Sequence, residues 1–405
     1  MLEALRLRDF RLLWIGLTAS LVGDGIYVVA IAWQAYQISN SPSALAVTGV
    51  AWTLPAVLLL PFSGVLSDRA GRRPLMITAF LLRAGATAVI GLVSLVGKVE
   101  IWHLVLVSIV FGLGDALFAP SFTALVPEIV PDHLLVQANS LDQAMRPLAM
   151  QFVGPALGGV IVASVGPGGA FVIDSASLLF GAAMLGLMHH APAERPAERP
   201  TLIADLREGA DYVRHNAWLS STLIAFSFTV LAFWGPVDVL VPYLIRNGIG
   251  GGAGGFGLVL AAGGAGAILM AVVVSRTGLP GRRLALTFGA FIISAYATAL
   301  YGVAGELWHM ALVSFLSGAC FSAGLIAWST TMQTRVPAAL LGRVSSLDWM
   351  VSSALVPVSY ALVGPVSRLI GVRGTLIAAG LVAGSILLAV LVAVPELREP
   401  EPVPV

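Results

Sequence analysis

The chain carries the stretch EIWHLVLVS at Glu100–Ser108 and a close copy of it, ELWHMALVS, at Glu306–Ser314. The two copies start 206 residues apart in a chain of 405 residues. The same offset relates Val130, Pro131, Leu134, Leu135, Ser140, Leu141 and Asp142 to Val336, Pro337, Leu340, Leu341, Ser346, Leu347 and Asp348. A period of half the chain length indicates two related halves and not an array of short repeats.

The composition is that of an integral membrane protein. Hydrophobic residues make up 58% of the chain and charged residues only 11%, against about 25% charged residues in an ordinary soluble domain. The first apolar run follows Arg6, Arg8 and Arg11 and continues to Gln34. It is too long for the apolar region of a cleaved signal peptide and long enough to cross a bilayer. The net charge of +1 says nothing about partners. From the apolar composition we expect the lipid bilayer as a partner, and we expect no nucleic acid.

Length and hydropathy predict an all-α membrane protein with twelve transmembrane helices in two parallel six-helix repeats. The predicted spans are Leu12–Gln34, Ala46–Gly64, Pro74–Val96, His103–Ala119, Ala144–Val165, Ala170–Leu187, Leu219–Tyr243, Phe256–Ser275, Leu284–Val303, Leu307–Thr330, Trp349–Ile370 and Thr375–Val394. Two similar membrane halves are how many secondary transporters are built, with the substrate site between the halves.

A polar segment divides the two predicted halves. Residues 189–218 form this linker between an N-terminal half (1–188) and a C-terminal half (219–394), and residues 395–405 form a tail. The second part of the linker has apolar residues at helical spacing, at Leu202, Leu206, Ala210 and Val213. This spacing predicts an amphipathic helix on the membrane surface.

The distribution of basic residues predicts the orientation in the membrane. Most of the 22 Arg and Lys residues lie in segments on one predicted side, and such residues concentrate on the cytoplasmic side of membrane proteins. An even number of spans places both termini on that side. We therefore predict a multi-pass protein of the cell inner membrane with both termini in the cytoplasm.

The predicted connection between the second and third spans has the sequence GVLSDRAGRR. It combines one acid, three arginines and two glycines, at Gly64, Asp68, Arg69, Gly71, Arg72 and Arg73. Glycine ends helices and permits close approach of two backbones. Orientation in the membrane accounts for the arginines, but it accounts neither for the acid nor for the glycines.

This connection resembles the loop pattern G-x-x-x-D-R-x-G-R-R of the major facilitator superfamily. In the fifth predicted span, Gly154-Pro155-Ala156-Leu157-Gly158-Gly159 is similar to the G-P-x-x-G-G motif that is typical of antiporters in that superfamily. Phe10–Leu13, Gly23-Asp24 and the turn Gly342–Val344 resemble the branch of enterobactin exporters and macrolide efflux pumps. The resemblance covers essentially the whole chain and implies the major facilitator fold.

The resemblance also implies a gate. Asp68 and the loop arginines are expected to latch the two halves on the cytoplasmic side, since an anion near a helix N-terminus is favoured by about 0.3–1 kcal/mol. In the fifth span the glycines would let a neighbouring helix approach, and Pro155 would weaken local helix bonding. Tight packing without a gating role is the alternative for this span.

The chain departs from the superfamily pattern in two places. Ser108 stands four residues before Gly112, where the drug-antiporter pattern has an arginine. The second half keeps only Gly281-Arg282-Arg283 of the loop motif and has no acid there. The first departure argues against proton coupling through an arginine at that position.

Acidic residues within predicted spans are candidates for the transport site. They are Asp24, Asp115, Asp174 and Asp238. An acid at mid-bilayer costs roughly 2.5–3.5 kcal/mol and normally faces a cavity or a partner. Asp24 lies deepest, between Gly23 and Gly25, and is the first candidate for proton coupling or substrate binding, followed by Asp115. The alternative for Asp24 is a fixed ion pair with Arg83, the obvious base within a span.

The remaining charged residues in or near spans have simpler interpretations. Asp174 and Asp238 lie near the outer ends of their predicted spans, and we expect both to reach interfacial water. Asp142 and Arg146 are four residues apart and are expected to form a structural pair.

Two aromatic pairs repeat with the halves. Trp102 and Trp308 stand at the outer ends of spans, where we expect them to anchor the protein at the membrane interface. His103 and His309 beside them are expected to be solvated interface residues and not pH sensors.

The sequence contains no motif for ATP, a metal or covalent catalysis. Gly252–Gly257 (GAGGFG) formally matches G-x-G-x-x-G, but no strand precedes it and we expect a flexible outer loop. A Walker loop is excluded because Lys98, the only lysine, is followed by Val99. Cys320 is the only cysteine, so no intrachain disulfide can form. We expect no enzyme activity, cofactor, metal or ATP.

These observations predict a secondary active transporter that uses alternating access. The preferred interpretation is a proton-coupled exporter, or antiporter, of an amphipathic small molecule or drug, and the direction of transport rests on the resemblance alone. One alternative is an exporter of a siderophore or another metabolite. An alternative of another class is a non-transporting membrane sensor or assembly factor, against which the Asp68 loop and Asp24 argue.

Overall fold

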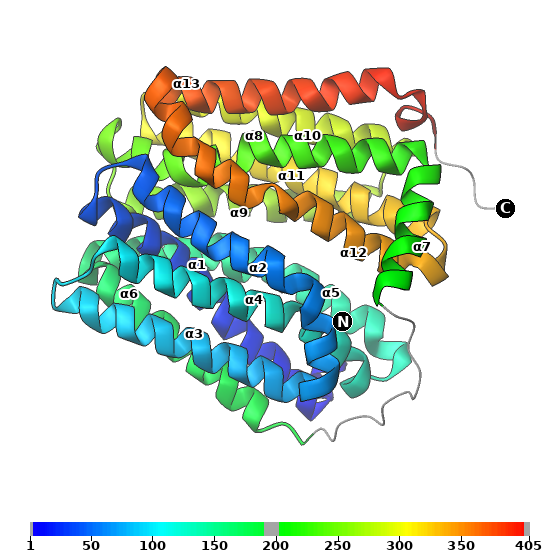
Figure 1. The fold of residues 1–405 in the computed structure, drawn as a ribbon, viewed down its shortest axis with the longest axis horizontal. Coiled ribbons are helices and arrows are strands. Elements are labelled where there is room, and N and C mark those ends of the chain that lie inside the picture. The colour runs from blue at the N-terminus through cyan, green and yellow to red at the C-terminus, as the bar shows by residue number, and fades with distance from the viewer. Residues whose placement is uncertain (1–2, 190–201, 401–405) are drawn as a thin grey trace. The chain divides into compact units, whose positions relative to one another are not determined.

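The computed structural model describes residues 3–189 and 202–400, and all regular structure in this part of the chain is helical (Figure 1). The helices up to the linker are α1 (Arg8–Ile38), α2 (Pro42–Ala70), α3 (Arg72–Leu95), α4 (Ile101–Ile129), α5 (Asp132–Arg146), the π-helix η2 (Pro147–Val153) and α6 (Gly154–Gly186). The helices from the linker onward are α7 (Leu202–His215), α8 (Ala217–Asn247), α9 (Ala253–Thr277), α10 (Arg283–Ala299), α11 (Leu307–Arg335), α12 (Ala338–Ala354) and α13 (Val356–Ala393). Short 3₁₀ turns are η1 (Ala4–Arg6), η3 (Leu300–Gly302) and η4 (Pro395–Leu397).

The prediction of an all-α membrane protein is confirmed. Among the described residues, ten helical segments are long and apolar enough to cross a bilayer. They include every helix from α1 to α4 and from α8 to α11, and two longer segments that contain α6 and α13. Apolar side chains face outward from these helices, as expected of surfaces that contact lipid.

The chain divides into two compact units. The first contains Met1–Glu194 together with Pro242–Ala261, and the second contains Arg195–Val241 together with Ala262–Val405. Helices α8 and α9 therefore each contribute residues to both units. The predicted halves differ from these units chiefly in the segment Pro242–Ala261, which packs with the first unit.

The repeat seen in the sequence appears in the structure as two matching helices. Both α4 and α11 have 29 residues, and each begins with a capping box. The Glu100 side chain accepts the backbone N–H of His103, whose ring accepts the backbone N–H of Glu100 (3.1 Å); Glu306 and His309 repeat the arrangement (3.2 Å). The two histidines thus cap helices, a role that our sequence analysis missed.

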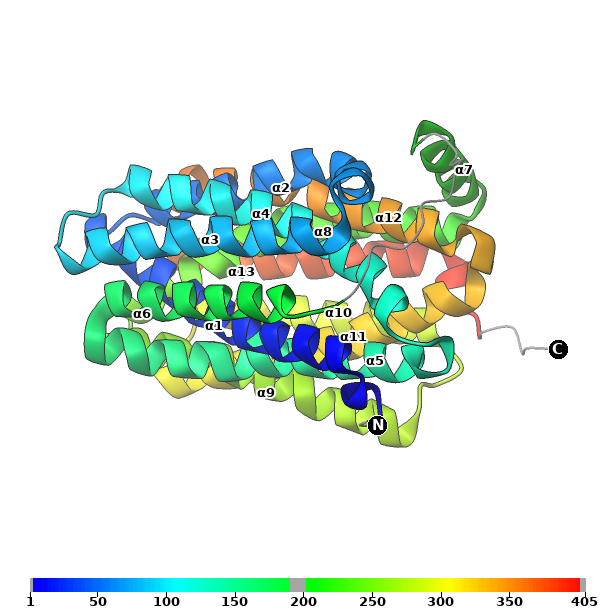
Figure 2. The ribbon, with the colours of Figure 1, turned by 90° about the horizontal axis from the view of Figure 1, so that it is seen from below.

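Two long helices reverse direction at a glycine. Gly166 in α6 has φ 78° and ψ 174°, and Gly371 in α13 has φ 75° and ψ 163°. A positive φ of this kind suits glycine, which has no Cβ. Figure 2 shows α6 turning back on itself, and Figure 1 shows the same for α13. Each helix thus consists of two arms, at the places where the sequence predicted a break between spans.

Two predicted loops are helical. α2 continues to Ala70, so the predicted loop at Gly64–Arg73 is wrong except at Gly71, whose φ of 88° ends the helix. No proline interrupts the segment before Gly71, and a helix tolerates an isolated glycine such as Gly64. The predicted outer loop at Gly252–Gly257 is also wrong beyond its first residue, because α9 begins at Ala253.

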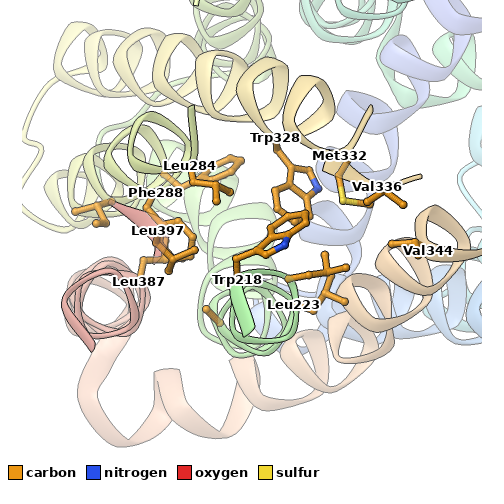
Figure 3. Packing of buried hydrophobic residues seen from close by; sticks show 14 residues of the cluster. Trp218, Leu223, Leu284, Phe288, Trp328, Met332, Val336, Val344, Leu387 and Leu397 are labelled. Carbon is orange, nitrogen blue, oxygen red and sulfur yellow. The ribbon is translucent and has the colours of Figure 1, made fainter. Parts of the chain in front are cut away.

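The second unit has an aromatic core. Trp218 of α8 meets Trp328 of α11 edge to face, with ring centroids 6.1 Å apart, and Phe288 of α10 lies in the same cluster (Figure 3). The predicted linker helix is present as α7, and it packs against α12. There Glu208 forms an ion pair with Arg343.

Candidate functional site

Arg83 of α3 lies at the centre of a buried charge cluster in the first unit. Its side chain donates a hydrogen bond from Nη2 to Oδ1 of Asp24 in α1, and its Nη1 lies 3.3 Å from Oδ1 of Asp115 in α4. Only 4% of Arg83 is exposed. The structure thus brings together Asp24 and Asp115, the two acids proposed from the sequence for proton coupling or substrate binding, with Arg83, the buried base proposed to pair with Asp24.

The two acids that share Arg83 differ in their access to the surroundings. The side chain of Asp24 is 10% exposed, whereas that of Asp115 is 40% exposed. The indole N–H of Trp52 in α2 also donates to Oδ2 of Asp115 at 2.8 Å. Arg83 therefore connects an enclosed acid with an accessible acid that has an aromatic neighbour.

Residues of α1 and α4 fix the position of the guanidinium group. Arg83 lies over the ring of Phe111, 4.3 Å from its centroid, and Tyr27 stacks on the same ring at 4.0 Å. A Cβ at Gly114 would lie 2.6 Å from Cδ of Arg83, so this position has room only for glycine. Our sequence analysis missed Phe111 and Gly114, whose only signal is their proximity in sequence to Asp115.

The glycines on either side of Asp24 hold α1 against both arms of α6. A Cβ at Gly23 would lie 2.0 Å from Oγ of Ser177, in the second arm. A Cβ at Gly25 would lie 2.8 Å from Cα of Gly154, at the start of the first arm. The backbone around Asp24 is therefore packed too closely on both sides to admit larger residues.

Asp174 corrects the sequence prediction. It was expected to reach interfacial water, yet it is 0% exposed, and neither of its carboxylate oxygens has a hydrogen-bond partner among the described residues. The second arm of α6 packs between α1 and α3 (Figure 2). Phe171 and Ser175 of this arm are buried there, and Ser175 donates to the carbonyl oxygen of Ala84 in α3 at 2.8 Å.

Asp238 behaves differently from Asp174. It is exposed, as expected of a residue that reaches interfacial water, and it accepts a hydrogen bond from the hydroxyl of Tyr360 at 2.5 Å. The predicted pair of Asp142 and Arg146 is confirmed, with Nε of Arg146 2.8 Å from Oδ2 of Asp142.

The glycine motif of α6 shows the expected close approach of helices. A Cβ at Gly158 would lie 3.0 Å from Cα of Ile26 in α1, and one at Gly159 would lie 3.0 Å from Cα of Gly257 in α9. The π-helix η2 precedes Pro155 directly, and such segments often mark functional sites. The gating role of Gly154, Pro155, Gly158 and Gly159 stays a prediction.

The described loop arginines bind helix ends within the first unit. Arg72 donates to the carbonyl oxygen of Ala124 at 2.6 Å and forms an ion pair with Glu128, both in α4. Arg73 donates to the carbonyl oxygens of Leu185 (2.8 Å) and Gly186 (2.6 Å) in α6. The side chains at positions 63–65 and 67–70 lie outside the described residues, so the latch roles of Gly64, Asp68 and Arg69 stay predictions.

Among the described residues, no group of three or more His, Cys, Asp and Glu side chains is placed to hold a metal ion. The cluster around Arg83 instead offers carboxylates that can exchange a proton or bind a cation. Arginine keeps its own proton in proteins, so any proton that moves within the cluster moves between the acids.

The chain matches known families and proteins along most of its length. The model of a family described as transmembrane secretion effector matches residues 1–404. The MFS-type transporter YfiS of Bacillus subtilis is 26% identical over 337 residues, which cover 81% of this chain and 79% of that protein. The multidrug efflux pump Tap of Mycolicibacterium fortuitum is 26% identical over 405 residues, with 96% of each chain covered.

A more distant relative and a solved structure agree with this match. Macrolide efflux protein A of Streptococcus pyogenes is 20% identical over 394 residues, with 96% of each chain covered. A bacterial homologue of the iron transporter ferroportin, in its inward-facing state, shares the fold with a TM-score of 0.70 and 16% identity over 95% of this chain and 98% of that chain. The chain therefore belongs to the transmembrane secretion effector family of the major facilitator superfamily, whose members are membrane transporters and not enzymes.

Proposed function

We propose that this protein is a proton-coupled exporter of amphipathic small molecules that works by alternating access. The observation that carries the proposal is the buried cluster of Asp24, Arg83 and Asp115 inside membrane-spanning helices. Ionisable residues at such depth are costly and usually mark a substrate pathway or a proton relay. No ATP motif is present in the sequence, so the proton gradient is the proposed source of energy.

The cluster suggests how a cation and a proton can compete. Asp115 is the accessible acid and lies beside Trp52, which is suitable for a ligand with a positive charge and an apolar body. A cation that binds Asp115 would weaken the hold of Arg83 on that carboxylate. Arg83 also pairs with Asp24. Binding of the cation would therefore alter the interaction between Arg83 and Asp24, the enclosed acid on which we place the coupling proton.

The names of two relatives support the substrate class. Macrolide efflux protein A and the multidrug efflux pump Tap are named for the export of antibiotics and drugs. We propose an amphipathic substrate of this kind, exported from the cytoplasm across the cell membrane.

The proposed topology has twelve crossings in two parallel repeats, with both termini in the cytoplasm. Ten segments are long and apolar enough to span the bilayer, and two of these contain the reversals at Gly166 and Gly371, which would each add one crossing. The matching capping boxes of α4 and α11 support the repeat. In this scheme Asp68, near the end of α2, and the arginines that follow it form a cytoplasmic latch, and the glycine motif of α6 is a flexible gate helix.

The test uses inverted membrane vesicles and a radiolabelled macrolide, with a cationic amphipathic dye as a second probe. Asp24→Asn is expected to abolish uptake driven by a proton gradient while equilibrium binding of the same compound persists. Asp211→Asn, in the exposed face of α7, is the matched control and should transport normally.

Two results would contradict the proposal. Driven uptake that survives in Asp24→Asn with unchanged pH dependence would remove Asp24 from the coupling site. Absence of driven uptake of both probes by the unmodified protein, with binding also absent, would favour the non-transporting alternative.

A further inference from the structure

We propose that Asp174 is a second proton site, and that in this conformation it is Asp174, not Asp24, that carries the proton. The inference rests on the proton coupling proposed above and deepens it. Asp24 and Asp115 are both engaged by Arg83, which leaves Asp174 as the buried acid in this unit without a counter-ion among the described residues.

The first argument is the lack of a partner. Asp174 is fully buried, and neither carboxylate oxygen accepts a hydrogen bond within the described structure. The Ser177 hydroxyl donates to the backbone carbonyl oxygen of Asp174 at 2.8 Å, and beside Gly23 it is the neutral polar group close to the Asp174 carboxyl group. An ionised carboxylate without a partner is strongly disfavoured in an apolar interior, and such a group takes up a proton instead.

The second argument is the charge balance around Asp174. The elements with the most extensive packing against α6 are α1, α3 and η2, and α9 approaches its first arm at Gly159, on the other arm from Asp174. The charged or titratable groups that act electrostatically on Asp174 are Asp24 and Tyr27 of α1 and Arg83 of α3, and η2 carries no titratable residue. One arginine thus serves three carboxylates. Because Arg83 already pairs with Asp24 and Asp115, a negative charge on Asp174 would have no cation of its own in the same interior.

The third argument is proximity to Asp24. A Cβ at Gly23 would lie 2.6 Å from Oδ1 of Asp174, so the Asp174 carboxyl group touches the α1 backbone at the residue before Asp24. The glycine leaves room for this contact.

These facts define a proton exchange between two acids. The Asp174 carboxylic acid gives its proton to the Asp24 carboxylate, while Arg83 leaves Asp24 and becomes the counter-ion of Asp174. Before and after the step, two of the three carboxylates are ionised and one guanidinium is charged, so the net charge of the cluster is unchanged. A step that conserves charge avoids the penalty of creating a new ion in a low-dielectric interior.

The experiment is infrared difference spectroscopy of the full-length protein in liposomes, titrated with protons alone. A protonated carboxylic acid that lacks strong hydrogen bonds has a carbonyl stretch well separated from the amide bands. We expect this band at neutral pH in the unmodified protein, its complete loss in Asp174→Asn, and its retention in the control Asp211→Asn. Asp174→Glu keeps the carboxyl group and should shift the band without removing it.

Three results would overturn the inference: absence of the band at neutral pH, its persistence unchanged in Asp174→Asn and Asp174→Glu, or its loss in the control Asp211→Asn. The measurement needs no substrate. A failure of proton-driven macrolide uptake in the unmodified protein would therefore sink the proposed function and leave the spectroscopic result intact, whereas the band results decide Asp174 separately. In vesicles, Asp174→Asn should also release fewer protons per bound macrolide than the unmodified protein.

Discussion

Helices α4 and α11 have similar sequences and backbone features, but the buried side chains around them differ in chemistry. They share their length, their capping boxes and a close approach at a glycine: a Cβ at Gly112 would lie 1.9 Å from the carbonyl oxygen of Trp52, and one at Gly318 would lie 2.2 Å from that of Gly263. At the same offset of 206 residues, however, Asp115 of α4 corresponds to Phe321 of α11. The backbone frame is therefore repeated, but the chemistry is not.

The surroundings of these two residues have diverged in the same way. Asp115 meets Arg83 and the indole of Trp52. Phe321 meets Phe291 edge to face with centroids 5.2 Å apart, and Trp234 at 6.2 Å. The two matching helices thus have different surroundings: α4 contributes to the titratable cluster, and α11 contributes to a continuous aromatic core. We expect coupling to depend on the first and apolar contacts on the second.

Removal of the shared cation should have the largest effect. Arg83→Met leaves Asp24 and Asp115 without their partner, and breaking a buried ion pair in this way costs about 3–5 kcal/mol. We expect a clear drop in the unfolding temperature in detergent and loss of proton-driven uptake.

Phe291→Leu in the second unit is the matched control for Arg83→Met. A hydrophobic exchange of this kind should cost less than Arg83→Met and leave the pH dependence of uptake unaltered. If Arg83→Met still couples uptake to the proton gradient, the proposed division of roles between the units is wrong.

The next effect comes from transplanting the acid. Phe321→Asp places an acid in the second unit at the position that corresponds to Asp115. Its neighbours there are the aromatic rings of Phe291 and Trp234, whereas Asp115 is next to a guanidinium group and an indole N–H donor. An acid within a span costs roughly 2.5–3.5 kcal/mol, so the yield of folded protein should fall. The double variant Phe321→Asp with Phe291→Arg should recover part of that yield. No recovery would show that the two interiors are not interchangeable.

The smallest effect tests the shared frame. Glu100→Ala and Glu306→Ala each remove one capping box, at a cost of about 0.5–2 kcal/mol. The two losses of thermal stability should be similar, with that of Glu100→Ala slightly larger because Trp102 also donates to the Glu100 side chain at 2.9 Å. Losses that differ by more than twofold would argue against equivalent helix starts.

The sequence predicted features that depend on neighbouring residues. The starts of α4 and α11 follow from a repeated local pattern, and the reversals at Gly166 and Gly371 fall where apolar runs were predicted to break. The pairing of Asp24 with Arg83 was available as an alternative, because few charged residues occur inside apolar runs and the choice of partners is small.

Features that depend on which helices face each other were not predictable. Asp174 seemed to lie near an outer surface because depth was judged from a span boundary, whereas packing of its helix arm between α1 and α3 buries it. The role of Gly114 could not be predicted from the sequence, because it depends on contact with another helix. The absence of a Cβ at Gly114 leaves space for the Arg83 side chain of α3. Likewise, the sequence could not tell that Gly71 and not Gly64 ends α2, because both lie in the same glycine-containing motif.

The reversals at Gly166 and Gly371 also bear on how the protein is made. Each joins two apolar helical arms through a single glycine in a non-helical conformation. Under the proposed topology, the turn at Gly166 carries no charged residue and the turn at Gly371 only Arg368 and Arg373, so a translocon has little hydrophilic sequence to hold on the far side while the second arm emerges. The arms have to enter the lipid together as a helical hairpin. A side chain at either glycine would then be selected against during synthesis, before the finished transporter meets its first substrate.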